Sequence, residues 1–212
     1  MPKINFLNCK IDISAKVFFP RPETEFWVGK AIKEIKNQKL GNENLHILDI
    51  FAGSGCIGIA ILKNIENTIV DFADISKEAL EEIKTNLQVN KIQKNRYRIL
   101  KSNIFEKLEK NKYNFIFANP PYVALNRIKE VDENVLEKEP HLALFAGKDG
   151  LKIIKVFLKE AKEYLDSQGR IFLEFDPLQV EELKKILRKE KYKFSLRKDQ
   201  FGKIRWLEAS LL

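Results

Sequence analysis

The apolar residues of this chain fall into short runs that alternate with segments of helical periodicity. Short, largely apolar runs are typical of strands that are buried on both faces of a parallel sheet. We predict such strands at 45–50, 68–73, 97–100, 113–118 and 170–175. Apolar residues spaced three and four apart predict helices at 26–35, 57–62, 77–90, 153–165 and 180–187. The alternation of the two patterns predicts an open α/β sheet.

The two ends of the chain depart from this alternation. Residues 4–19 are rich in apolar side chains with polar breaks, which predicts a small β-hairpin or meander. At the other end, strands at 192–197 and 204–209 flank a turn at 199–202. A dinucleotide-binding fold would keep adding βα units, so a closing antiparallel pair distinguishes this chain from it.

Several connecting segments also carry signals. Residues 41–44 are predicted to be a loop, and residues 123–148 show no clear periodicity. Loops of that length in compact domains are usually functional or disordered. We expect Asp149 to cap the next helix, Gly169 to open the following strand, and Pro177 to lie in the first turn of the last helix.

The sequence Asn119-Pro120-Pro121-Tyr122 directly follows the predicted strand at 113–118. Each proline lacks a backbone N–H and disfavours a helical conformation for the residue before it, so the tetrapeptide is stiff. Ligands of α/β sheets bind in the crevice outside the carboxyl ends of the strands. There the Asn119 amide and the Pro120 carbonyl could accept from an –NH2 group, and Tyr122 would offer a flat face to a planar amide or base. A turn that merely ends the strand is the alternative.

A glycine-rich sequence follows the predicted strand at 45–50. Gly53, Gly55 and Gly58 match the pattern G-x-G-x-x-G, which lets the backbone approach a nucleotide closely while the chain turns into a helix. By itself this motif is a weak indicator of a nucleotide or nucleoside site. The candidate cofactor-binding residues around it are Asp49, Ile50, Phe51, Ala52, Gly53 and Gly55.

Two further strand ends supply candidate cofactor contacts. Asp74 lies 21 residues beyond Gly53, a spacing at which a carboxylate reaches the ribose hydroxyls of an adenosine ligand. Its alternative role is to cap the next helix, which Ser76 can do instead. By position, Asn103 could bond the adenine amine and Ile104 could pack on the ring face.

The segment at 19–25 reads Phe-Pro-Arg-Pro-Glu-Thr-Glu. Its prolines stiffen the approach to a helix, and its acids fall in the first turn, where the helix dipole favours negative charge. A segment that holds an arginine and two carboxylates could equally form one wall of a ligand site. Pro20 and Glu23 are therefore further candidates for cofactor contact.

Composition narrows the class of protein. The net charge of +8 and the pI near 9.3 would suit RNA or a ribosome-associated partner, but lysines mixed with glutamates are usually solvated helix faces. Cys9 and Cys56 are too few for a disulfide framework, and neither they nor His46 and His141 have the spacing of a metal site. No run approaches the roughly 20 apolar residues that span a bilayer. We expect a cytoplasmic protein without a metal, a membrane span or a signal peptide.

Four blocks together resemble the Rossmann-like methyltransferases that use S-adenosylmethionine, and specifically the HemK/PrmC family of release factor glutamine methyltransferases. The blocks are 19–25, 48–58, 119–122 and 139–151. The resemblance implies a class I fold with a seven-stranded, mostly parallel sheet and a C-terminal antiparallel hairpin, preceded by an N-terminal β-hairpin. It implies a hairpin and linker at 1–20 and a methyltransferase domain at 21–212.

The resemblance also implies a reaction, in which a methyl group passes from S-adenosylmethionine to the side-chain amide of the glutamine in the Gly-Gly-Gln motif of a peptide chain release factor. Asn119, Pro120, Pro121 and Tyr122 would be the catalytic residues, because they orient the amide nitrogen. One alternative is methylation of a flipped-out adenine in RNA or DNA by the same tetrapeptide. Others are an NAD-dependent oxidoreductase and a non-catalytic domain that keeps the fold.

The chain departs from the family pattern at a few positions. Phe51-Ala52 stands where Gly-Thr is usual, Asn103 where aspartate is usual, and Asp176 where glycine is usual. Phe51 narrows the methionine side of the pocket, and Asn103 gives up a charge but keeps an acceptor. Related enzymes that methylate a ribosomal-protein glutamine carry Pro-Arg-Ser-Pro at 20–23. Family members usually have a docking helical domain ahead of the hairpin, so we expect a short form that lacks it.

Overall fold

The computed structural model describes residues 3–38, 44–110 and 112–212. Seven strands form one sheet in the order β5-β4-β3-β6-β7-β9-β8. Their bounds are β3 (Leu45–Ile50), β4 (Thr68–Asp74), β5 (Tyr97–Lys101), β6 (Tyr113–Ala118), β7 (Leu165–Glu174), β8 (Tyr192–Lys198) and β9 (Ile204–Leu211). The strands from β3 to β7 are parallel, and β9 lies antiparallel between β7 and β8. The predicted sheet and its closing hairpin are confirmed.

Helices pack on both faces of this sheet, around two apolar clusters. The helices of the first cluster are α1 (Pro22–Lys36), α2 (Cys56–Asn64) and α3 (Lys77–Val89), and those of the second are α6 (Lys152–Ala161) and α7 (Val180–Lys189). Side chains alternate along a strand, so Phe115 and Phe117 join the first cluster while Ile116 joins the second. Burial on both faces explains why the strands are largely apolar. No helix in the described part of the chain is long and apolar enough to cross a membrane.

The predicted N-terminal hairpin is confirmed as β1 (Lys3–Phe6) and β2 (Cys9–Asp12), and two asparagines of α3 hold it. Asn90 accepts from the backbone N–H of Lys10 at 3.0 Å and donates to its carbonyl at 2.7 Å. Asn86 pairs with the N–H and carbonyl of Asp12 in the same way, at 2.6 and 3.0 Å, and also donates to the carbonyl of Ser54 at 3.0 Å. One side chain therefore joins the hairpin to the glycine-rich loop.

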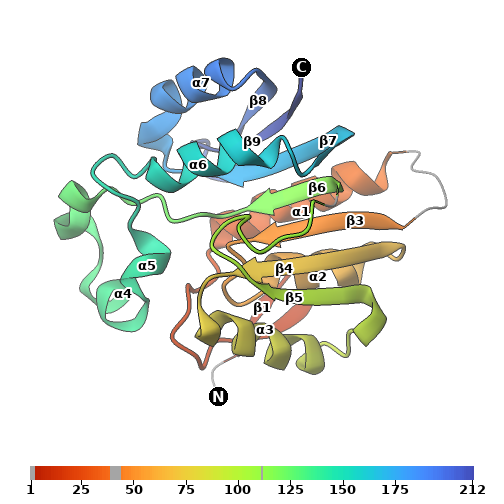
Figure 1. Cartoon of the computed structure of the whole chain (residues 1–212). Helices are drawn as coiled ribbons and strands as arrows, with labels where there is room; N and C mark the ends of the chain where they lie inside the picture. The colour runs from red at the N-terminus through yellow and green to blue at the C-terminus, as the bar shows by residue number, and fades with distance from the viewer. Residues whose placement is uncertain (1–2, 39–43, 111) are drawn as a thin grey trace.

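The prediction that residues 123–148 lack regular structure is wrong. The segment contains η2 (Leu125–Glu130), α4 (Glu133–Lys138) and α5 (His141–Leu144). These helices are too short for an apolar periodicity to register. In Figure 1, α4 and α5 lie beyond the carboxyl ends of the parallel strands, apart from the other helices.

Element boundaries differ from the prediction at several places. The N-cap of α6 is Leu151, and Asp149 instead accepts from the Leu151 N–H at 3.0 Å, so its expected capping role is wrong. β7 begins at Leu165, ahead of Gly169, with a register shift against β6. Ser76 caps α3 as expected, and Pro177 opens η3 (Pro177–Gln179) ahead of α7. The loop expected at 41–44 lies outside the described residues except for its last position.

The substitution Asn86→Ala removes the amide that pairs with Asp12 and Ser54 and leaves buried backbone groups without partners. We expect the free energy of unfolding to fall by about 2–4 kcal/mol, since each unsatisfied buried group costs about 1–3 kcal/mol. Urea unfolding followed by circular dichroism measures the change. Thr85→Ala, at an exposed position of the same helix, is the control and should cost less than about 0.5 kcal/mol. Equal losses in the two variants would contradict the role given to Asn86.

Candidate functional site

A cavity of about 740 Å³ lies at the carboxyl ends of β3, β4, β5 and β6. Residues that precede α1 and residues of α4 and α5 complete its walls. The cavity brings together most of the candidates predicted from the sequence: Pro20, Ile50, Phe51, Ala52, Gly53, Asp74, Asn103, Ile104, Asn119, Pro120, Pro121 and Tyr122. The four sequence blocks thus meet at one edge of the sheet.

Three sequence-predicted candidates lie outside the lining of this cavity. Asp49 is fully buried, and its Oδ2 accepts from the Gly58 N–H at 2.8 Å. Gly55 is the N-cap of α2, with φ of 76°. Glu23 lies in the first turn of α1, where its neighbour Thr24 lines the cavity instead. Asp49 and Gly55 shape the loop from behind, and Glu23 is not brought to the cavity.

Several backbone N–H groups of the glycine-rich loop are bound by the protein itself. The Gly53 N–H donates to Asp74 Oδ2 at 2.9 Å, and the Ala52 N–H donates to the Ala73 carbonyl at 3.1 Å. A phosphate-binding loop needs such N–H groups free to face the anion. Here a carboxylate already fills that place, so the loop suits a nucleoside whose hydroxyls donate to Asp74.

Asp74 and its neighbours form the nucleoside end of the cavity. Asp74 Oδ1 accepts from the Ser76 N–H at 2.9 Å, so both carboxylate oxygens are held in place. Burial raises the pKa of Asp74, and the hydrogen bonds from Ser76 and Gly53 oppose this rise. Asn103 donates its Nδ2 to Glu106 at 2.8 Å, and Ile104 is almost fully buried beside it. This end offers acceptors for hydroxyls and an apolar surface for a ring.

Asn119 forms the other end of the site together with Pro120. Its Nδ2 donates to Thr24 Oγ1 at 3.3 Å, and Thr24 Oγ1 in turn donates to Glu174 Oε2 at 2.7 Å. Since the –NH2 group of Asn119 faces Thr24, its carbonyl oxygen lies on the other side of the amide. The site can therefore present that oxygen and the Pro120 carbonyl as two acceptors.

Tyr122 is fixed at both its ends. Its hydroxyl donates to Glu174 Oε1 at 3.0 Å, and its carbonyl accepts from Gln179 Nε2 at 2.8 Å. Gln179 also donates to the carbonyl of Asp149 at 3.1 Å. At Gly150 an added Cβ would lie 2.1 Å from the Tyr122 carbonyl oxygen, so only glycine fits there. The end of the tetrapeptide is clamped between β7, η3 and the turn before α6.

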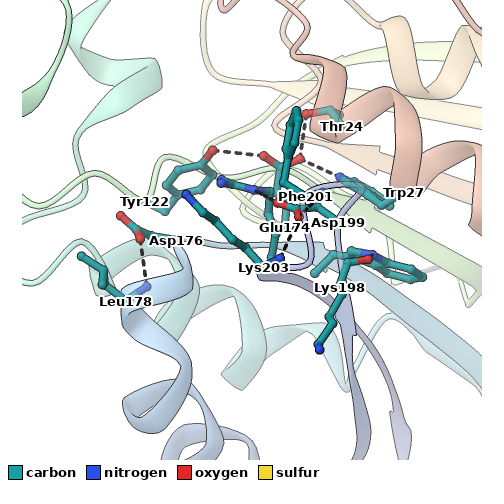
Figure 2. A network of polar contacts seen from close by, with 12 residues as sticks. Thr24, Trp27, Tyr122, Glu174, Asp176, Leu178, Lys198, Asp199, Phe201 and Lys203 are labelled. Carbon is teal, nitrogen blue, oxygen red and sulfur yellow. Dashed lines mark hydrogen bonds and ion pairs between the residues drawn. The ribbon is translucent and has the colours of Figure 1, made fainter.

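The sequence analysis missed Glu174, which is 1% exposed and accepts hydrogen bonds from two elements. Figure 2 shows Thr24 and Trp27 reaching it from α1 and Tyr122 from the loop after β6. Trp27 Nε1 donates to the same oxygen as Thr24, at 2.6 Å. Burial raises the pKa of Glu174, and these three donors oppose the rise. A lone acid in the apolar run at 171–175 was the available signal.

An ion pair connects the first and last sequence blocks. Arg21 Nη2 lies 2.5 Å from Glu139 Oε1, and Glu139 is 1% exposed. The Arg21 guanidinium also lies over the ring of Phe18, 4.7 Å from its centroid. The pair ties the wall made by α4 and α5 to the residues that precede α1.

The comparisons with known proteins agree with this geometry. Residues 32–142 match the family model described as "Methyltransferase small domain". The release factor glutamine methyltransferase of Streptococcus pneumoniae is 37% identical over 203 residues, which cover 95% of this chain and 70% of that protein. The chain belongs to the release factor glutamine methyltransferase family. Another family member, from Lactococcus lactis, is 35% identical over 96% of this chain and 73% of its own length.

Two solved structures of other proteins have the same fold as this chain. The ribosomal protein L11 methylase of Lactobacillus delbrueckii superposes with a TM-score of 0.63 at 18% identity, over 91% of this chain and 79% of that one. The catalytic domain of human Mettl16, solved with an RNA hairpin, gives a TM-score of 0.71 at 16% identity, over 97% and 76%. At these identities the likeness concerns the fold alone.

Within the described residues, no group of three or more metal-ligating side chains gathers.

In this member of the release factor glutamine methyltransferase family, Gly150→Ala tests the clamp on Tyr122. Gly150 and Gly202 both have a left-handed backbone, with φ of 70° and 79°, but nothing lies within 4 Å of a Cβ at Gly202. Gly202→Ala should cost about 1–2 kcal/mol for the backbone alone. Gly150→Ala should cost at least about 1–3 kcal/mol more, because the Tyr122 carbonyl must move.

Thermal unfolding and the methylation rate measure the two effects, and only Gly150→Ala should lower the rate. Equal stability and equal rates in the two variants would show that the carbonyl of Tyr122 moves aside freely, which would contradict the clamp.

Proposed function

We propose that this chain transfers a methyl group to the side-chain amide nitrogen of the glutamine in the Gly-Gly-Gln motif of a peptide chain release factor. The main support for this proposal is the orientation of Asn119, whose –NH2 group donates to Thr24. The carbonyl oxygen of Asn119 and that of Pro120 then form an acceptor pair that matches the two hydrogens of a primary amide. The names of the relatives, which act on a release factor glutamine, support the same substrate.

The cofactor of this family is S-adenosylmethionine, which supplies an electrophilic methyl group on a sulfonium. The cavity fits it, because Asp74 occupies the loop N–H that a phosphate would need and leaves acceptors for ribose hydroxyls. We assign Asp74 to the ribose and Asn103 and Ile104 to the adenine. We assign the methionine portion to the remaining candidates that line the cavity, namely Pro20, Ile50, Phe51, Ala52, Gly53 and Asn119.

The protein contributes orientation to the reaction. An amide nitrogen is a poor nucleophile because its lone pair is delocalised into the carbonyl. Asn119 and the Pro120 carbonyl hold the two amide hydrogens and so direct the nitrogen along the line of attack. The stiffness of Pro120-Pro121 and the fixed position of Tyr122 keep these acceptors in place. The cofactor would supply the methyl group, and one of the two amide protons that Asn119 and the Pro120 carbonyl hold would be released in the transfer.

The remaining expectations follow from this assignment. We propose residues 21–212 as the methyltransferase domain, preceded by the hairpin and linker at 1–20. We propose the cytoplasm as its compartment, since Cys9 and Cys56 are both buried and free.

An adenine amine could occupy the same acceptor pair, but the relatives favour a release factor. NAD is disfavoured because its pyrophosphate would need the loop N–H groups that Asp74 and Ala73 already bind.

The function is tested by incubating the purified chain with radiolabelled S-adenosylmethionine and one of three acceptors. The acceptors are a release factor, the same factor with its motif glutamine changed to alanine, and total RNA or DNA. We expect label in the intact release factor alone. Label in nucleic acid but not in the factor would replace the proposed substrate. Label in both release factors would place the methyl group on another residue.

The proposed roles of Asn119 and Asp74 predict opposite effects on binding and turnover. Asn119→Ala removes an acceptor that orients the amide, so kcat should fall about 100-fold with little change in cofactor Kd. Asp74→Ala removes hydrogen bonds to a charged group worth about 1.5–3 kcal/mol, so the cofactor Kd should rise at least about 10-fold. Calorimetry and single-turnover kinetics separate the two quantities. Equal losses of binding and turnover in both variants would contradict these roles.

A further inference from the structure

Glu174 lies behind the wall of the cavity. Thr24, Asn119 and Tyr122 line the cavity in front of it. Its carboxylate is held by Thr24 and Trp27 of α1 and by Tyr122 after β6 (Figure 2). A buried carboxylate is costly unless it is hydrogen-bonded, and an apolar residue would suit the core position better. We propose that Glu174 is a positioning residue that fixes the orientation of the Asn119 amide through Thr24, an inference that rests on the proposed function.

The direction of each hydrogen bond fixes the orientation of the next side chain. An ionised carboxylate can only accept, so Thr24 must donate its single O–H to Glu174. Towards Asn119, Thr24 then has only lone pairs, and the –NH2 group of Asn119 must face it. If the Asn119 amide were reversed, its Oδ1 would face Thr24 Oγ1, and no proton would lie between these two acceptors. The acceptor oxygen Oε2 of Glu174 thus sets which atom of Asn119 a substrate meets.

Two donors share Oε2 of Glu174 and a third meets Oε1, so both oxygens of the carboxylate accept hydrogen bonds. Burial raises the pKa of Glu174 above its ordinary value, and the donors Trp27, Thr24 and Tyr122 and the positive charge of Arg205 limit the rise. Arg205 Nε is itself held by Asp199 Oδ2 at 2.9 Å. The acceptor oxygen of Asn119 is therefore maintained by hydrogen bonds that run from Glu174 of β7 through Thr24 of α1 to the tetrapeptide.

Trp27 Nε1 can only donate and shares Oε2 of Glu174 with Thr24, so in Glu174→Gln the glutamine oxygen takes that position and the relay is kept. The substitution Glu174→Leu instead removes both acceptor oxygens, which frees the threonine proton to face Asn119 and permits the reversed amide. We expect Glu174→Leu to lower kcat at least 10-fold while the cofactor Kd changes less than about 3-fold, and Glu174→Gln to keep most of kcat. Glu208→Gln on β9 is the control away from the cavity, since Glu208 accepts from Arg170 and Arg197. Its kcat should equal that of the unchanged chain.

Variants of Thr24 separate the positioning role from a loss of stability. Thr24→Val keeps the shape but removes the relay, and should lower kcat as Glu174→Leu does. Thr24→Ser keeps the hydroxyl, and should retain most of the activity. In the double variant Thr24→Val with Glu174→Leu, the loss should be no greater than the larger single loss, because both changes break one relay. Losses that multiply, or unchanged kcat in Glu174→Leu, would overturn the proposal.

A measurement without substrate distinguishes this inference from the proposed function. The side-chain amide ¹⁵N–¹H signals of Asn119 should shift and broaden in Thr24→Val and Glu174→Leu but not in Thr24→Ser or Glu208→Gln. If the unchanged chain labels no release factor while these signals change as expected, the proposed substrate fails and the positioning role stands. If the signals stay the same in all four variants, the positioning role fails whatever the substrate.

Discussion

The carboxylate of Glu174 is the constraint on which the geometry of the site depends. It lies in the core between the sheet and α1, where each of its oxygens must find a donor. Trp27 and Thr24 supply two from the helix, and Tyr122 supplies one from the loop after β6. Satisfying one buried charge therefore sets the position of the helix and of the tetrapeptide relative to the sheet. The site is held in place because these donors come from separate parts of the fold.

The nucleoside end of the cavity follows a related logic. Its loop has the glycine pattern common to many nucleotide-binding folds, yet the protein's own carboxylate and carbonyl groups take up its N–H groups. Gly58 serves packing, since a Cβ there would lie 2.3 Å from the ring of Phe72. The glycine spacing alone would not separate a phosphate site from a hydroxyl site. The two are distinguished by the Asp74 carboxylate and the Ala73 carbonyl, which accept hydrogen bonds from the loop N–H groups.

The sequence contains enough to predict the sheet, both hairpins and a set of candidate residues most of which line one cavity. Those features depend on local signals, such as apolar runs, prolines and glycines next to strand ends. The short helices within 125–144 were not predicted, because they are held by contacts with the rest of the fold and not by their own periodicity. Glu174 was missed for a similar reason. Its partner Thr24 is 150 residues away, and no pattern in one sequence joins two such positions.

The asparagine pair on α3 has a consequence for how copies of the chain meet. β1 pairs with one edge of β2, and the outward backbone groups of Lys10 and Asp12 on the other edge bind Asn90 and Asn86. A bare strand edge is a template on which a second molecule can add its own strand. Here the side-chain amides stand where that strand would lie. The outer edge of β2 is thereby protected against edge-to-edge aggregation by Asn86 of α3 and by Asn90 at its C-cap.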